Sequence, residues 1–369
     1  MSAPRPITYW DYIRVEDLLS LQGGIPGDDS KVSNDEVLFI TVHQVFELWF
    51  KLVLRELVTA RNLFQAERVA EQELSGAVKS LQRACSVLRV ANQHWEVMET
   101  LSTREFLAFR DKLFPASGFQ SAQLRQIEIL FGLSMDERIL LGLEGGYMEA
   151  LRSHDGSASP AHARVQKQLA DKPSLKDAID EWLYRTPIDG SDPKQKDDER
   201  RVRSFLEAYL DCHAREIDAT SEHAAKIART PEDGERIRQR YEAEKASVRA
   251  FFSPSAEEGG AKCARIRAAM LFIETYRELP LLAWPRELLD SIVELEQFLV
   301  ILRQRHARMV ERVIGRRTGT GGSAGVDYLD TTALKYRIFR DLWAIRTLQV
   351  RRAAAPELAS AAFYDFRNS

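Results

Sequence analysis

Two of the seven histidines lie on apolar stripes of segments with helical periodicity. Phe46, Phe50 and His43 follow Phe39 at helical spacing, so all four share one face of a helix and the imidazole joins an aromatic wall. His306 lies in a similar setting. A single histidine so placed is more often a core residue bonded to a backbone carbonyl. Two of them on separate helices could also face each other across a planar cofactor such as haem, which needs an axial imidazole and an apolar slot.

The segment around His306 combines an apolar stripe with many arginines. The stripe recurs at helical spacing and consists of Leu299, Leu302, His306, Met309 or Val310, and Val313. The arginines are expected to ring the outside of this helix, and they are Arg303, Arg305, Arg308 and Arg312.

Residues 319–325 form a glycine-rich stretch shortly after His306 and read Gly-Thr-Gly-Gly-Ser-Ala-Gly. Neither a helix nor a central strand tolerates so many glycines, because each one leaves the backbone too free. Bare amide N–H groups and hydroxyls suit a carboxylate or a phosphate. The sequence therefore predicts a loop here that closes on a ligand, and it places the chemistry in the C-terminal third.

The other five histidines are less informative. His94 lies between polar and aromatic neighbours and is ambiguous. The remaining four lie among polar residues and are predicted to be surface side chains; they are His154, His162, His213 and His223.

Composition narrows the class of protein. With 369 residues, of which 44% are hydrophobic, the chain can bury a large core. A net charge of −3 and interspersed charges of both signs exclude a basic nucleic-acid or membrane-surface protein. Cys85, Cys212 and Cys263 form no CxxC pair, which favours a reducing compartment. No apolar leader or uninterrupted stretch of about 18 apolar residues is present, so we expect a cytoplasmic protein.

The periodicity is helical almost throughout and predicts an all-α fold. Residues 35–65 form one helix, and Ser102 with Glu105 forms a capping box for a helix that runs towards residue 113. A break follows, and residues 123–133 resume the pattern. Residues 153–160 and 187–198 are predicted loops.

The middle third reads as a helical insertion. Thr230 and Pro231 open a mostly polar helix, which residues 253–260 end, and we expect it to be solvated rather than part of the core. Two further helices are predicted from residue 261, split at Pro280 and Pro285, and the last runs from about residue 286 to 314.

From about Tyr9 to about Val350, the chain resembles the tryptophan 2,3-dioxygenase family in three separated motifs. Residues 35–51 are similar to the family's distal-pocket helix, and residues 106–121 are similar to its substrate-carboxylate segment. Residues 305–325, with His306 and the glycine-rich stretch, are similar to its axial-histidine segment and loop.

The resemblance implies a homotetramer with one b-type haem in each subunit, which inserts both atoms of O2 into L-tryptophan and gives N-formylkynurenine. His306 would be the axial iron ligand, and Gly321 and Ser323 of the loop would contact the cofactor. His43 would be the catalytic residue on the distal side and would bond the indole N–H. The other expected substrate contacts are Phe39 and Phe106 beside the ring, Arg110 at the carboxylate, Thr320 at the amino-acid end, and Tyr9 and Tyr12 from a neighbouring subunit.

The resemblance also implies a division of the chain. Residues 1–34 would reach into a neighbouring subunit, and residues 35–150 and 261–350 would form a large haem-binding helical domain. Residues 151–260 would be the helical insertion, and residues 351–369 a C-terminal tail.

Several positions depart from the family pattern at the pocket edge and in the loop. Trp10 and Asp11 separate the two tyrosines, Asn34 replaces a histidine, Ala324 replaces a serine, and Asp327 is unusual. These departures motivate an alternative, in which a biosynthetic relative oxygenates a substituted tryptophan, even as a monooxygenase that gives an oxindole. A haem sensor or carrier without turnover is a third possibility, but a carrier needs no amino-acid clamp of the kind that Arg110 would supply.

Overall fold

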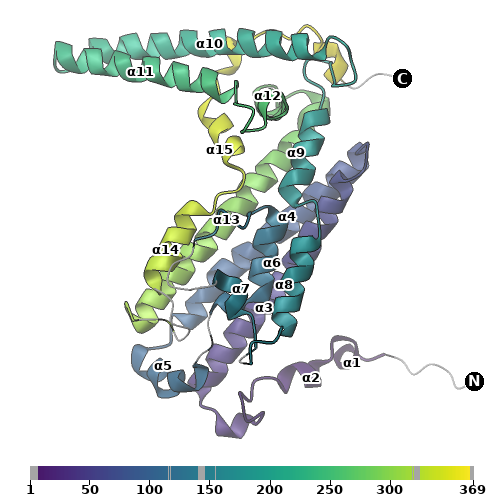
Figure 1. Ribbon diagram of the computed structural model, residues 1–369, viewed down its shortest axis with the longest axis vertical. Helices are drawn as coiled ribbons and strands as arrows, with labels where there is room; N and C mark the ends of the chain where they lie inside the picture. Colours follow the sequence, from purple (N-terminus) through teal and green to yellow (C-terminus); the bar gives the residue numbers. More distant parts are fainter. Residues whose placement is uncertain are drawn as a thin grey trace, which may run out of the picture. The chain divides into compact units, whose positions relative to one another are not determined.

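Every regular element in the described part of the chain is a helix. The computed structural model describes residues 7–114, 116, 118–139, 146–153, 155–317, 319 and 325–365. Within these residues the only β contacts are two isolated bridges, Arg152 with Ala158 and Ile188 with Ser191. The predicted all-α fold is confirmed (Figure 1).

The chain divides into two compact units, each assembled from separated segments. The first unit contains residues 1–55, 84–171 and 297–336. The second unit contains residues 56–83, 172–296 and 337–369. This division follows from which residues contact one another in space. The functional division into a haem-binding domain, an insertion and terminal segments stays a prediction.

The first unit holds the candidate site. Its helices, three of which also contribute residues to the second unit, are α1 (Tyr9–Ile13), α2 (Val15–Leu19), η1 (Asp29–Lys31), part of α3 (Asn34–Phe64), part of α4 (Glu71–Met98), α5 (Thr103–Phe109), η2 (Arg110–Leu113), η3 (Gly118–Gln120), α6 (Ala122–Phe131), α7 (Gly146–Ala150), α8 (Pro160–Ala170), part of α13 (Ala283–Ile314) and α14 (Val326–Lys335).

The second unit contains the remaining helices and the other parts of α3, α4 and α13. Its own helices are α9 (Leu175–Arg185), α10 (Asp198–Lys226), α11 (Pro231–Phe251), α12 (Gly260–Thr275), η4 (Pro280–Leu282), α15 (Arg340–Thr347), η5 (Arg352–Ala354) and η6 (Ala361–Tyr364).

Helix ends follow the local signals of the sequence. Ser102 and Glu105 form the predicted capping box of α5, although the α-helix ends at Phe109 and continues as the 3-10 helix η2. Thr230 caps α11, with Pro231 in its first turn, as predicted. The predicted split at Pro285 is wrong. Since α13 begins at Ala283, Pro285 lies in the first turn, where its missing N–H costs no hydrogen bond.

Helix α3 is apolar enough to pass a simple test for a membrane span. Among the described residues, Asn34–Phe64 is the single helix long and apolar enough to cross a membrane by length and composition. Core helices of soluble proteins pass the same test. Two carboxylates of α3, Glu36 and Glu47, are bound by side chains of the first unit. This helix is therefore part of a packed protein structure along its N-terminal half.

In the second unit, α10 and α11 lie side by side as a long hairpin (Figure 1). Helix α11 buries only Gly234 and Val248, which confirms the expectation of a solvated helix. One expectation fails here: His213 of α10 is 5% exposed and is not a surface side chain. Its sequence neighbours are polar, but burial at this position is decided by the packing of the surrounding helices.

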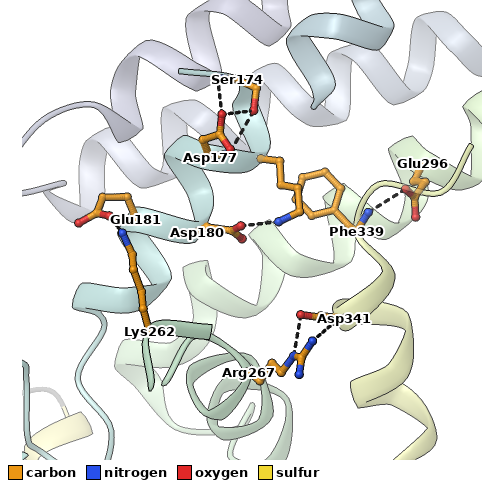
Figure 2. Close-up of polar contacts among 10 residues, drawn as sticks. Ser174, Asp177, Asp180, Glu181, Lys262, Arg267, Glu296, Phe339 and Asp341 are labelled. Carbon is orange, nitrogen blue, oxygen red and sulfur yellow. Dashed lines mark hydrogen bonds and ion pairs between the residues drawn. The ribbon is translucent and has the colours of Figure 1, made fainter. Parts of the chain in front are cut away.

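Charged pairs connect α9, α12 and α15 within the second unit. Figure 2 shows Lys262 bound to Glu181 at 2.6 Å and Arg267 bound to Asp341 at 2.8 Å. The buried Glu296 accepts hydrogen bonds from the backbone N–H of Phe339, at 3.0 Å, and of Ile338, at 2.6 Å. Glu296 also binds the indole N–H of Trp343, and so it fixes the chain where α15 begins.

Candidate functional site

One cleft in the first unit brings together side chains from distant parts of the sequence. Its empty space, including the part open to solvent, is about 1220 Å³. Five of the predicted site residues line it, and they are Phe39, His43, Phe106, Arg110 and His306. They come from α3, α5, η2 and α13, so tertiary packing joins what the sequence separates by more than 260 positions.

His43 is held by its own helix. Its Nδ1 lies 2.7 Å from the carbonyl oxygen of Phe39, one turn earlier, and the two rings are 4.1 Å apart. A carbonyl can only accept, so Nδ1 carries the proton and Nε2 is left as a hydrogen-bond acceptor. Burial lowers the pKa of His43, which keeps the ring neutral near pH 7. A bond to a backbone carbonyl is what a purely structural core histidine would make, but His43 also lines the cleft.

The expected aromatic wall divides into two groups. Phe39 packs near Phe106, at 5.9 Å between ring centroids, and both line the cleft. Phe46 turns instead to α4, where its ring lies 4.1 Å from Trp95 and 5.2 Å from His94. The previously ambiguous His94 therefore packs against an aromatic side chain and does not line the cleft.

His306 occupies the opposite helix α13. Burial, with smaller effects of His43 and Arg125, lowers its pKa to about 4. The ring stacks on Trp95, with centroids 4.8 Å apart and planes 6° apart. A neutral imidazole is the form that binds a metal ion, and a stacked ring has little freedom to rotate. Burial and packing thus keep His306 neutral and its ring orientation fixed.

A buried charge cluster lies at the same cleft. Glu128 of α6 is bound by three guanidinium groups, at 2.9 Å from Arg125, 2.8 Å from Arg138 and 3.2 Å from Arg303. Burial alone would raise the pKa of Glu128, but the three positive charges outweigh it and hold the pKa at about 2. Arg125, Arg303 and Glu128 all line the cleft, so this cluster leaves an excess of positive charge there.

This cluster corrects one expectation and adds residues that sequence analysis missed. Arg303 was expected on the outside of its helix, yet it is 9% exposed and lies over the ring of Tyr336 at 5.3 Å. At this position the buried carboxylate of Glu128 faces the helix from α6, so Arg303 is paired inside the unit rather than solvated. The spacing of Arg125 and Glu128, three residues apart on one helix, was the only available signal.

Arg110 lies where η2 begins, and its backbone N–H bonds the carbonyl of Phe106. The two side chains are one turn apart and both line the cleft. A guanidinium presents a planar pair of donors that matches a carboxylate. The cleft therefore places an apolar ring surface next to a carboxylate-binding group.

The other predicted site residues either do not line the cleft or lie outside the described residues. Tyr9 and Tyr12 are 73% and 79% exposed and do not line it. Thr320, Gly321 and Ser323 lie outside the described residues, as does Ala324. Gly319 and Gly325, which bound this stretch, both line the cleft. Gly325 has φ +57°, and a Cβ there would lie 3.0 Å from the carbonyl oxygen of Arg317, so this position requires glycine.

Comparison with known proteins identifies the family. Residues 2–349 match the family model described as "Tryptophan 2,3-dioxygenase". The chain belongs to the tryptophan 2,3-dioxygenase family. The match spans both compact units, so the family resemblance is not confined to the cleft.

Several similar proteins from bacteria have names of this family. A "Tryptophan 2,3-dioxygenase" of Sorangium cellulosum is 55% identical over 98% of this chain and 88% of that protein. A "Tryptophan 2,3-dioxygenase 2" of Ralstonia nicotianae is 51% identical over 98% of each chain. A "Tryptophan 2,3-dioxygenase-like protein" of Xanthomonas campestris is 50% identical over 72% of this chain and 98% of that protein. These names do not favour the alternative of an oxindole-forming relative.

Proposed function

We propose that the chain is a haem-dependent oxidoreductase that opens the indole 2,3 bond of L-tryptophan with O2 and gives N-formylkynurenine. The observation that carries this proposal is the meeting of His43, Arg110 and His306 in one cleft of a member of this family. His43 would be a neutral hydrogen-bond acceptor, Arg110 would bind the substrate carboxylate, and His306 would be a neutral metal ligand.

The residues of the cleft fit haem b. His306 would bind the iron, and Met309, Val310, Val313 and Ile314 supply an apolar surface along the same helix. The surplus positive charge of Arg125 and Arg303 beside Glu128 suits the two carboxylates of the haem edge. Gly321 and Ser323 are proposed as further cofactor contacts. The bound cofactor would supply the activation of O2, and the protein would supply orientation and exclusion of water.

The substrate contacts follow from the same geometry. We infer that the indole ring packs against Phe39 and Phe106 and that its N–H donates to Nε2 of His43, which the bond to Phe39 leaves as an acceptor. Arg110 would bind the carboxylate with two parallel hydrogen bonds. Thr320 is proposed at the amino-acid end. Together these contacts would hold the indole 2,3 bond in one orientation for oxygen insertion.

The assembly proposed for the enzyme is a homotetramer. The N-terminal segment exposes large apolar side chains, including Ile7, Tyr9, Trp10 and Tyr12, which are 57% to 79% exposed. Apolar surface of this kind is stabilised when another chain covers it. We propose that the segment packs on a neighbouring subunit, where Tyr9 and Tyr12 would close that subunit's cleft. The three cysteines are free thiols, which supports the proposed cytoplasmic location.

The mass of the product tests the function. The haem-loaded enzyme is incubated with L-tryptophan, ascorbate and ¹⁸O2, and we expect a product with two labelled oxygen atoms. A variant of the exposed His223, His223→Ala, serves as a control and should behave as the wild type does. A product with one labelled oxygen atom, or no product from a haem-loaded enzyme, would contradict the proposal.

A further inference from the structure

One face of α3 carries both the substrate contacts and two carboxylates. Glu36, Phe39, His43 and Glu47 are separated by three, four and four positions, so they align along this face. The two rings between them line the cleft. The carboxylates at either end of this face bind two other segments that line the cleft, η2 and the start of α6.

The first carboxylate binds the segment of Arg110. Glu36 Oε2 lies 2.7 Å from Nζ of Lys112, and the two side chains are 8% and 49% exposed. Lys112 follows Arg110 by two residues in η2, a helix of only four residues. So short a helix has few hydrogen bonds of its own, and its orientation depends on what anchors it.

The second carboxylate binds the start of α6. Glu47 accepts from the Ser121 hydroxyl at 2.6 Å and from the Gln123 side-chain amide at 2.7 Å. Ser121 is also the N-cap of α6 and accepts from the N–H of Leu124, a residue that lines the cleft. Glu47 therefore fixes the first turn of the helix that carries Arg125 and Glu128.

We propose that Glu36 and Glu47 are positioning residues. Glu36 would act through Lys112 on Arg110, and Glu47 would act through the first turn of α6. This inference rests on the proposed function, because it assigns to Arg110 the binding of the substrate carboxylate. A bidentate pair tolerates little misalignment, so a loosely held η2 would weaken carboxylate binding without altering the indole contacts.

The test compares Glu36→Gln with a matched variant on the same helix. Glu56 binds Arg83 at 2.8 Å, and their side chains are 12% and 51% exposed, so Glu56→Gln removes an ion pair of the same kind away from the cleft. In the haem-loaded full chain, Glu36→Gln should raise the Kd and KM for L-tryptophan about tenfold, as expected for a weakened charge-assisted hydrogen bond. Its kcat and its Kd for tryptamine, which lacks the carboxylate, should stay within about twofold of the wild type.

Three further variants guard against a failure to fold and extend the test to Glu47. Lys112→Met removes the same ion pair from its exposed side and should reproduce the effect of Glu36→Gln, while Lys112→Arg should retain wild-type affinity. Glu47→Gln should weaken the affinity for both ligands, because α6 lines the cleft more broadly. Equal effects of Glu36→Gln and Glu56→Gln on tryptophan affinity would overturn the positioning role of Glu36, as would equal losses for tryptophan and tryptamine in Glu36→Gln. Wild-type affinity of Glu47→Gln for both ligands would overturn the role of Glu47.

Failure of the positioning role can be separated from failure of the proposed function. Arg110→Lys serves as the reference, because it alters the clamp directly. If Arg110→Lys weakens tryptophan binding and Glu36→Gln does not, the positioning role fails and the function stands. If the wild type neither binds nor oxidises tryptophan, the function fails. Amide hydrogen exchange of residues 106–114 then decides the positioning role: faster exchange in Glu36→Gln than in Glu56→Gln supports it, and equal exchange refutes it.

Discussion

His306 and His43 lie in the same cleft, but their surroundings differ, and so do the roles proposed for them. Stacking on Trp95 holds the ring of His306 and a pKa of about 4 keeps it neutral, which suits the iron ligand that we propose. The hydrogen bond from Nδ1 to Phe39 leaves His43 with an accepting Nε2. Both residues are histidines, so the different proposed roles rest on their neighbours, a carbonyl acceptor for His43 and a stacked indole for His306.

Substitution His306→Ala should abolish stoichiometric haem binding, because the axial imidazole would be the main bond between protein and iron. The ratio of Soret to protein absorbance measures the loss. The control variant His94→Ala removes an imidazole of α4 that does not line the cleft, and it should keep its haem. A full Soret band with a histidine-ligated spectrum in His306→Ala would show that the assignment is wrong.

Substitution His43→Ala should leave haem content unchanged and lower kcat/KM for tryptophan by roughly 10- to 1,000-fold, typical of the loss of one positioning hydrogen bond. The difference in kcat/KM between tryptophan and its 1-methyl analogue should become smaller, because the N–H contact that distinguishes the two substrates is lost. Steady-state kinetics with both substrates measure this. A haem-free or unfolded variant would instead mean that His43 has only a structural role.

At the scale of the element, Glu296 stabilises the start of α15. It is 1% exposed and accepts from two backbone N–H groups and from the indole of Trp343. The variant Glu296→Gln replaces one accepting oxygen by a donor that faces other donors, and we expect a loss of about 2–4 kcal/mol in the free energy of unfolding. Urea denaturation measures it. The exposed Glu357→Gln is the control and should change stability by less than about 0.5 kcal/mol.

The α10–α11 hairpin should be sensitive to pH through His213. Burial lowers the pKa of His213 below its value in an unfolded chain, while Glu244 and Glu216 oppose this effect. The folded state then binds fewer protons than the unfolded state below about pH 6.5, so stability should fall as the pH falls through this range. The variant His213→Gln should show a smaller decrease in Tm between pH 7.5 and pH 5.5 than the wild type. An identical decrease in both proteins would contradict the argument.

At the scale of the whole molecule, the exposed N-terminal segment should determine assembly. Deletion of residues 1–21 removes the apolar side chains proposed to pack on a neighbouring subunit, and we expect particles smaller than a tetramer by light scattering. The control Ile227→Ser removes an apolar side chain that is 71% exposed in the second unit and should leave the assembly unchanged. An intact tetramer without residues 1–21 would place the subunit contacts elsewhere.

Local signals in the sequence were sufficient for the fold class and for most helices. Ser102 and Thr230 predicted helix starts correctly, because a side-chain cap acts on backbone groups within three residues. His43 was selected from helical periodicity, whereas Phe106 and Arg110 were selected from the resemblance to one family. Interactions between residues that are close in the sequence can be predicted from the sequence alone.

Only the tertiary structure decided which charged and titratable groups are buried. Arg303 and Glu128 are 175 residues apart in the sequence, and no local pattern indicates that they form an ion pair. His213 has polar sequence neighbours and is nevertheless buried. Burial and charge pairing depend on which helix faces which, so the shifted pKa values and the buried charge cluster arise only when segments from distant parts of the chain are packed together.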